Sequence, residues 1–425
     1  MRRDRRVEQV IAFISIFMLL HLLLSCNSRT SSPNAALAPP LQRSLAVARF
    51  STSSLDDAAA DHAFGLASQI ISNNSSALSL TRNGSVSQFT TGKGIILTQT
   101  DYKNVCAEPG YIHVVNQINW CNGTTDALGC SDTPGKCMVL VRWTPDAAQD
   151  PAQQEEGILW AHEYGHTKGL QHRNDADAVM NPVLGPSHLK ISSCECDAYL
   201  ERGSCSAAAA APPSQAAGVE GFVRQIYIHG VPAQQARQYS SLEDVKKLAQ
   251  LLQNPEDQPY WANAVMTLGL IGTPNASQEL ASFLNRGSGV LTPAAYRAKS
   301  SAVIAMGYAL ARSGREPLLA FLEKKTDPKA WQTLSWSSPF TSDPDQEHLQ
   351  LARSAVAALG VSGNAKAATV LEGIQRKSGP EKAEFYDSLK EALDENHDVR
   401  KIGFDAYVIK NEQARNRGET NESPK

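Results

Sequence analysis

The chain has 425 residues, of which 42% are hydrophobic and 20% are charged, and its formal net charge is -3. This length allows two ordinary domains, and the hydrophobic content suits a globular protein with a buried core. Lys and Arg total 40 against 43 for Asp and Glu, so no basic excess points to nucleic acid as a partner.

The N-terminus has the pattern of an export signal. Four arginines within the first six residues precede an apolar stretch from Val10 to Leu24, whereas a membrane-spanning helix needs about 20 apolar residues. An uncleaved signal anchor is the alternative. The run Leu23-Leu-Ser-Cys26 resembles the lipobox of bacterial lipoproteins. That resemblance implies a signal peptide over 1–26, a lipidated Cys26 and, because Asn27 follows, a lipid anchor in the outer membrane on its periplasmic or surface side.

Residues 27–43 are rich in Ser, Pro and Ala and predict a flexible tether. Beyond the tether, residues 44–205 mix strand and helix patterns, which predicts an α+β domain with a mixed sheet. Apolar and β-branched runs predict strands at 45–50, 94–98, 111–118 and 138–143. Amphipathic patterns predict helices at 56–71 and 155–168 and a last helix that begins at Ser192 or Ser193.

All cysteines except Cys26 lie in this region, and export favours disulfides among them. The local pairs that we expect are Cys130 with Cys137 and Cys106 with Cys121, and one of Cys194, Cys196 and Cys205 remains free. A zinc cluster of cysteines is the weaker alternative, because the spacings lack regular Cys-x-x-Cys pairs.

The most informative run is His162-Glu-Tyr-Gly-His-Thr-Lys-Gly-Leu-Gln-His172. Within a helix, His162 and His166 share one face, so both imidazoles can reach a single zinc ion. Gly169 can adopt the left-handed conformation that ends the helix and turns the chain back, which lets His172 supply a third nitrogen.

Three neutral ligands leave one position open for a water, and Glu163 is placed to take a proton from it. A bare His-Glu-x-x-His run also arises by chance on amphipathic helices. Gly169, His172 and the later run Val179-Met-Asn-Pro182 argue against chance.

The extended pattern resembles the metzincin metalloproteases, and among them the matrixin-like branch, over residues 44–205. The resemblance implies zinc ligands His162, His166 and His172, the general base Glu163, and a Met-turn in which Met180 lies beneath the metal without binding it. Pro182 stands where some metzincins carry a tyrosine ligand, so that variant is disfavoured. A plain core role is the alternative for Met180.

Other implications concern the substrate cleft. By the resemblance, an edge strand in the region of 138–143 borders the cleft and pairs with an extended peptide. Residues 182–184 then line the pocket after the scissile bond, or merely pack the lower lobe. The sequence lacks a cysteine-switch propeptide, and Arg173 departs from the family pattern. The family's further zinc and calcium ligands cannot be picked out, and His113 and Asp126 are loose candidates only. We therefore expect one catalytic zinc and leave the binding of calcium open.

Residues 206–218, rich in Ala and Pro, predict an interdomain linker. A weak repeat follows in which alanine-rich helices at 260–272, 296–307 and 351–360 each precede a second helix, at 276–284, 316–322 and 365–374. This pattern over 219–410 resembles HEAT repeats, with 325–346 as an insertion. Trp331 and Trp336 in the insertion are either contact residues or buried anchors, and residues 411–425 predict a disordered tail.

These observations favour an exported, lipid-anchored zinc endopeptidase that cleaves protein or peptide substrates, with the helical repeats docking a substrate or protein partner. A non-repetitive helical bundle that merely extends the structure is the alternative for the repeats. The rival function is a non-catalytic zinc-containing scaffold of the cell envelope. A third reading keeps the hydrolase but gives it an envelope substrate other than protein.

Overall fold

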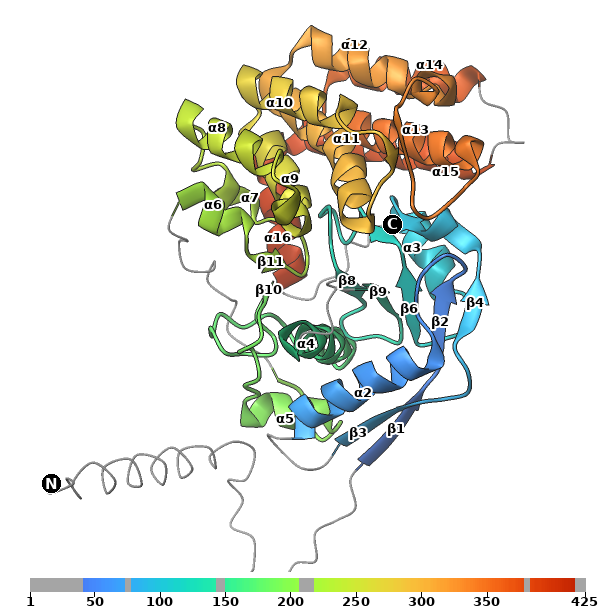
Figure 1. The fold of residues 1–425 in the computed structure, drawn as a ribbon, viewed down its shortest axis with the longest axis vertical. Coiled ribbons are helices and arrows are strands. Elements are labelled where there is room, and N and C mark those ends of the chain that lie inside the picture. Colours follow the sequence, from blue (N-terminus) through green and yellow to red (C-terminus); the bar gives the residue numbers. More distant parts are fainter. Residues whose placement is uncertain (1–40, 73–77, 143–149, 206–217, 378–382, 417–425) are drawn as a thin grey trace, which may run out of the picture.

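The computed structural model describes residues 41–72, 78–142, 150–205, 218–377 and 383–416, and these form a mixed α/β region followed by a largely helical region (Figure 1). Cys26, the signal peptide and nearly all of the predicted tether and linker lie outside the described residues. No described helix is long and apolar enough to cross a membrane.

The α/β region runs from the first described strand to the short helix after the His162–His172 run. Its elements are β1 Leu41–Leu45, β2 Val47–Phe50, α2 Asp57–Ser72, β3 Leu78–Arg82, β4 Ser87–Phe89, η1 Thr91–Gly94, β5 Ile95–Ile96, α3 Gln99–Cys106, β6 Ile112–Val115, β7 Gln117–Ile118, β8 Gly129–Ser131, β9 Met138–Val141, α4 Asp150–Thr167, β10 Val183–Leu184 and α5 Ser193–Tyr199.

A five-stranded mixed sheet of order β4-β2-β6-β9-β8 is the centre of this region. Its strands are parallel except β8, which runs antiparallel to β9 at the edge. The helices α2 and α4 pack together on the sheet (Figure 1). The predicted mixed sheet and the three predicted helices are therefore present, and α5 begins with a capping box in which Ser192 and Glu195 bond each other's backbone N–H groups.

The sequence analysis placed the cleft's edge strand wrongly. The strand at 138–143 is β9, which lies inside the sheet between β6 and β8, so β8 is the edge. This strand has only three residues, Gly, Cys and Ser, and such a composition carries little β-propensity. Similarly, residues 41–43 of the predicted tether belong to β1, which pairs with β3.

The predicted disulfide pairs are also wrong. The structure has Cys106–Cys137, Cys121–Cys130 and Cys194–Cys205. Cys106 ends α3, which packs on β9, and Cys137 directly precedes β9, so this packing brings the two cysteines together. No described cysteine is free, so the expectation that one of Cys194, Cys196 and Cys205 stays free is wrong as well. Three such disulfides are typical of an extracytoplasmic protein.

The helical region consists of helices joined by short turns and three two-residue strands. Its elements are α6 Gly218–Val223, β11 Ile226–Tyr227, α7 Ala233–Ala236, α8 Leu242–Leu251, η2 Pro255–Tyr260, α9 Trp261–Ile271, α10 Pro274–Asn285, β12 Gly289–Val290, α11 Pro293–Ser313, α12 Glu316–Lys325, η3 Pro328–Trp331, β13 Trp336–Ser337, α13 Pro344–Val361, α14 Ala365–Lys377, α15 Ala383–Ile402 and α16 Phe404–Asn416.

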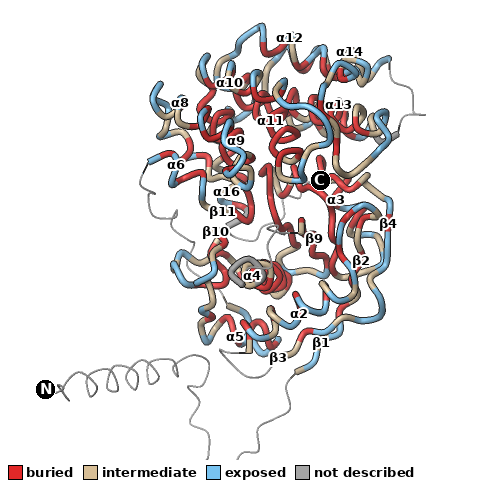
Figure 2. Tube along the Cα trace, in the orientation of Figure 1, coloured by how far each residue is buried: buried red, intermediate tan, exposed pale blue. Residues whose placement is uncertain are grey.

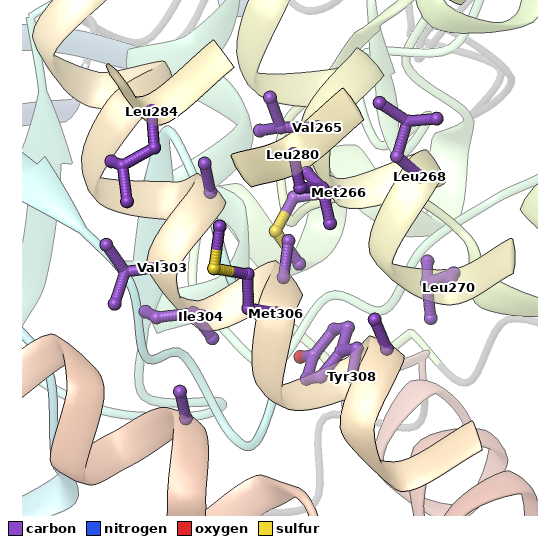
Figure 3. Close-up of a cluster of buried hydrophobic side chains, with 14 of the residues drawn as sticks. Val265, Met266, Leu268, Leu270, Leu280, Leu284, Val303, Ile304, Met306 and Tyr308 are labelled. Atoms are coloured by element: carbon purple, nitrogen blue, oxygen red, sulfur yellow. The ribbon is translucent and has the colours of Figure 1, made fainter. Parts of the chain in front are cut away.

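The three predicted helix pairs are present as α9 with α10, α11 with α12 and α13 with α14. The first helices of the pairs stack side by side, α9 on α11 and α11 on α13, and α13 packs on α15. Figure 3 shows the apolar side chains that fill the space between α9, α10 and α11, including Met266, Leu280, Met306 and Tyr308. Each pair therefore buries its faces against the next.

Glycines on the first helices allow this close stacking. A Cβ on Gly269 would lie 2.5 Å from the Ala305 carbonyl oxygen of the next helix, and a Cβ on Gly307 would overlap the carbonyl oxygen of Ala358. Gly360 approaches the backbone of Ala392 in the same way. These three glycines are thus points at which the backbones of neighbouring helices touch.

Burial decides two expectations of the sequence analysis, the role of the two tryptophans in the predicted insertion and the order of the predicted tail. Trp331 and Trp336 are buried anchors whose indole N–H groups donate to the carbonyls of Lys325 and Leu284, each at 2.8 Å. Residues 411–416 of the predicted disordered tail are helical, because α16 packs back on the α/β region. Asn411 is buried there and donates to the Gly123 carbonyl.

The helical region and the α/β region share a polar interface as well as apolar contacts. Arg353 donates to both carboxylate oxygens of Asp101, at 2.7 and 2.8 Å, and to Ser388. Arg297 bonds Asp126 at 2.7 Å. These pairs join residues far apart in the sequence, so the two regions form one packed body.

We expect Gly307→Ala to destabilise the protein by about 1–3 kcal/mol, because the added methyl group must push α13 away. Gly373→Ala in α14 is the matched control, since a Cβ there meets no atom within 4 Å. Alanine in that helix should be neutral or stabilise by up to about 1 kcal/mol. Urea unfolding of the three chains measures both effects, and equal stabilities would refute the close approach.

Asp101→Ala should cost about 3–5 kcal/mol of unfolding free energy, because it leaves the buried guanidinium of Arg353 without its carboxylate. The side chains of this pair are 2% and 9% exposed, whereas those of the Lys366–Glu316 pair are 70% and 63% exposed. Glu316→Ala, the control, should change stability by less than about 1 kcal/mol. Similar losses in both variants would contradict a buried interface pair.

Candidate metal centre

The helix α4 presents two histidines on the face toward the centre of the molecule. His162 and His166 are four residues apart, and their Nε2 atoms lie 3.0 Å from each other. Figure 2 shows α4 as a largely buried helix, and both side chains are almost fully shielded from solvent. The helical spacing therefore places two imidazoles at one point, as the sequence pattern required.

The turn after α4 adds a third imidazole. Gly169 has a φ of +83°, in the left-handed region, and the next residue, Leu170, donates its N–H to the Gly165 carbonyl at 3.0 Å. The chain then reverses, and the Nε2 of His172 lies 3.2 Å from that of His166. All three histidines predicted as metal ligands thus meet in one cluster.

A fourth histidine, which the sequence analysis did not identify, completes the group. His229 follows β11 in the helical region, and its Nε2 lies 3.2 Å from that of His162 and 3.3 Å from that of His166. The four nitrogens lie within 4.8 Å of one another. The run Ile226-Tyr-Ile-His229, a β-branched and aromatic run in a helical region, is the sequence signal that could have found it.

Backbone carbonyls fix the orientation of three of the rings. The Nδ1 atoms of His162, His166 and His229 lie 2.8, 2.8 and 3.0 Å from the carbonyl oxygens of Val179, Leu170 and Gly129 respectively. A carbonyl only accepts, so each Nδ1 carries the proton. In the neutral rings the Nε2 lone pairs then face one another.

Facing lone pairs at such distances repel, and a bound cation removes the repulsion. Burial, and next the neighbouring His166, lower the pKa of His162 well below its ordinary value, which keeps that ring neutral and able to bind metal. Protons on the rings would place positive charges side by side in this buried space, so they are a poor substitute for a metal. The arrangement is therefore one that could hold a metal ion, with backbone carbonyls orienting three of the imidazoles that would bind it.

The donor set fits zinc. Zinc binds imidazole nitrogen at about 2.0–2.1 Å, so nitrogens at the corners of a regular tetrahedron lie about 3.3–3.4 Å apart. Four of the six separations are 3.0 to 3.3 Å, and all six are at most 4.8 Å. Imidazole also suits copper, nickel and iron, whereas calcium requires oxygen ligands. No second such group of His, Cys, Asp or Glu side chains occurs among the described residues.

Glu163 lies beside the cluster and is fully buried. Its Oε2 accepts a hydrogen bond from the Ser131 hydroxyl at 2.7 Å, and its Oε1 is 3.4 Å from the Nε2 of His229. Burial raises the pKa of Glu163 to about 8, and the bond from Ser131 opposes that rise. The carboxyl also fills the space next to Gly129, where a Cβ would collide with it. The carboxyl group of Glu163 thus lies next to the His229 imidazole at one side of the cluster.

The remaining predicted residues have structural positions near this group. Met180 is buried, with its Sδ 3.6 Å from the Tyr199 hydroxyl, and a Cβ on Gly165 of α4 would lie 2.6 Å from that sulfur. The carbonyl of Pro182 accepts from the N–H of Ile228 at 3.0 Å. Met180 is not in the metal-binding group, and its turn positions Val179, the partner of His162.

The two loose candidates for further metal ligands lie elsewhere. His113 places its Nε2 3.1 Å from the Glu108 carbonyl, and Asp126 pairs with Arg297. Neither belongs to a group that could hold an ion. Both are therefore parts of the packed structure.

Comparison of the chain with protein-family models, with curated proteins and with solved structures found no match. The interpretation of this site consequently depends on its own residues and their geometry.

The full chain should bind one divalent metal ion at this site, and His166→Ala should lower the metal content severalfold, because that ring contacts the other three. His397→Ala, on the exposed side of α15, is the control and should leave it unchanged. Mass spectrometry of metal after dialysis against zinc measures both. Stoichiometric metal in the His166 variant would contradict the site.

Proposed function

We propose that the chain is a zinc-dependent endopeptidase of the metzincin, matrixin-like kind. The observation that carries the proposal is the convergence of His162, His166 and His172 on one point with Glu163 beside it. In such enzymes, the run His-Glu-x-x-His followed by Gly and a third His brings three imidazoles and a glutamate to one zinc ion. The mixed sheet with α4 packed on it supports the same assignment.

A zinc ion bound by the imidazoles supplies two things, polarisation of a carbonyl and acidification of a water. Glu163 is the group that accepts the proton and returns it to the leaving amine. Ser131 holds one carboxylate oxygen of Glu163 by a 2.7 Å hydrogen bond, so the other oxygen stays directed toward the histidines. The burial of these side chains strengthens the electrostatic effects.

An extended peptide is the substrate class that suits the surroundings of the site. The edge of the sheet at β8 and the strand β10 lie on two sides of the cluster. Their main-chain groups, which the segment that includes β11 engages in this structure, are of the kind that pairs with an extended peptide. Pairing of this kind recognises a backbone more than any one side chain.

The setting of this activity is the bacterial envelope. The disulfides agree with export, and lipidation of Cys26 would tether the enzyme to the outer membrane, facing the periplasm or the surface. The stacked helix pairs are HEAT-like, and their role is to dock a protein substrate or partner.

A second function is favoured by one observation, the fourth histidine. Sites with four protein ligands are typical of structural zinc, whereas catalytic sites keep an open position. On this alternative the chain is a non-catalytic zinc-containing scaffold of the envelope, and His229 is a permanent ligand.

The test measures the cleavage of a peptide library by four chains. These are the parent chain, the Glu163→Gln variant, the His229→Ala variant and the chain that carries both substitutions. Loss of the proton acceptor should reduce cleavage by at least about 100-fold in both backgrounds, while the metal content stays at one ion per chain. Cleavage that survives Glu163→Gln, or no cleavage by either zinc-loaded parent chain, would reject the endopeptidase and leave the scaffold.

A further inference from the structure

The segment from Ile226 to Gly230 lies in an extended conformation between the two borders of the candidate site. On one side β11 pairs antiparallel with β10, and the Ile228 N–H donates to Pro182. On the other side the Ile228 carbonyl accepts from the N–H of Leu128 at 2.7 Å. The segment thus engages main-chain groups on both sides, which are the groups that an extended peptide needs.

The same segment carries the fourth imidazole to the cluster. His229 makes an antiparallel bridge with Ala127, donates from Nδ1 to the Gly129 carbonyl, and places Nε2 against His162 and His166. Gly230 follows with a φ of +83°, and a Cβ there would collide with the Thr125 carbonyl, so the turn out of the site requires glycine.

Burial shows the effect of this arrangement on access. The side chains of His162, His172 and Glu163 are 0% exposed, and His229 is 3% exposed. A peptide cannot contact Glu163 while the segment is in place. Because Tyr227 is buried in the core of the helical region, the segment moves only together with that region or by local opening.

We propose that residues 226–230 are an internal inhibitor that occupies the substrate position of the site, with His229 as a displaceable fourth metal ligand. The proposal rests on the proposed function, since it assigns the regulation of that site. The α/β region alone holds three imidazoles and the proton acceptor. The helical region holds the group that covers them.

The experiment uses the full chain with two changes at this position, His229→Ala and His229→Asn. The asparagine variant lacks the Nε2 atom but keeps an N–H donor for the Gly129 carbonyl. It therefore replaces the alanine variant in the experiment if that variant does not fold. His397→Ala is the matched control. Each chain is loaded with Zn²⁺ for cleavage assays and with Co²⁺ for visible absorption, and azide is the probe for an open metal position.

Both His229 variants should keep one metal ion per chain, and their cobalt spectra should shift with azide, whereas the parent and control spectra should not. Peptide cleavage should rise by up to about 10- to 1000-fold, because loss of the His229 imidazole weakens the hold of the segment on a site that is open in about 0.1–10% of molecules. An azide response without cleavage would support the displaceable cover and reject the endopeptidase.

Two results would overturn the proposal. Metal content well below one ion in folded His229 variants would make His229 an indispensable structural ligand. An equal azide response and equal cleavage in the parent chain and the variants would show that the segment excludes nothing.

Discussion

Four buried imidazole nitrogens that face one another are the feature on which the rest of this structure depends. Their lone pairs point inward because the opposite nitrogens of three rings donate to carbonyls of Val179, Leu170 and Gly129. Those carbonyls belong to three separate segments of the chain. Each segment must therefore be positioned within tenths of an ångström, and the sheet, α4 and the Met180 turn provide that positioning.

The cluster also joins the two regions energetically. Three ligands come from the α/β region and the fourth from the helical region, so a metal bound by all four stabilises their association as well as each fold. The buried Arg353–Asp101 pair and the α16 contacts act in the same direction. The linker composition predicted a separate helical domain. The helical region is instead part of the site, because it supplies His229.

Local patterns in the sequence predicted the parts that depend on local physics. The i, i+4 spacing of His162 and His166, the left-handed Gly169 and the serine cap of α5 all follow from helix geometry, and so do the three helix pairs. His229 could not be found in this way, because its role comes from the tertiary pairing of β11 with β10. The disulfide prediction was wrong for the same reason, since the packing of α3 on β9, and not proximity in sequence, brings Cys106 to Cys137.

The buried carboxyl of Glu163 bears on the choice between a structural and a hydrolytic site. A buried polar atom without a hydrogen-bond partner costs about 1–3 kcal/mol, and more when it is charged. The Oε1 of Glu163 is such an atom, 3.4 Å from the His229 ring. A structural site with four histidines gains nothing from this cost, since the ligands already satisfy the metal. A site that moves a proton requires such a group, and under the proposed function the cost would be recovered when the segment of His229 withdraws and a substrate enters.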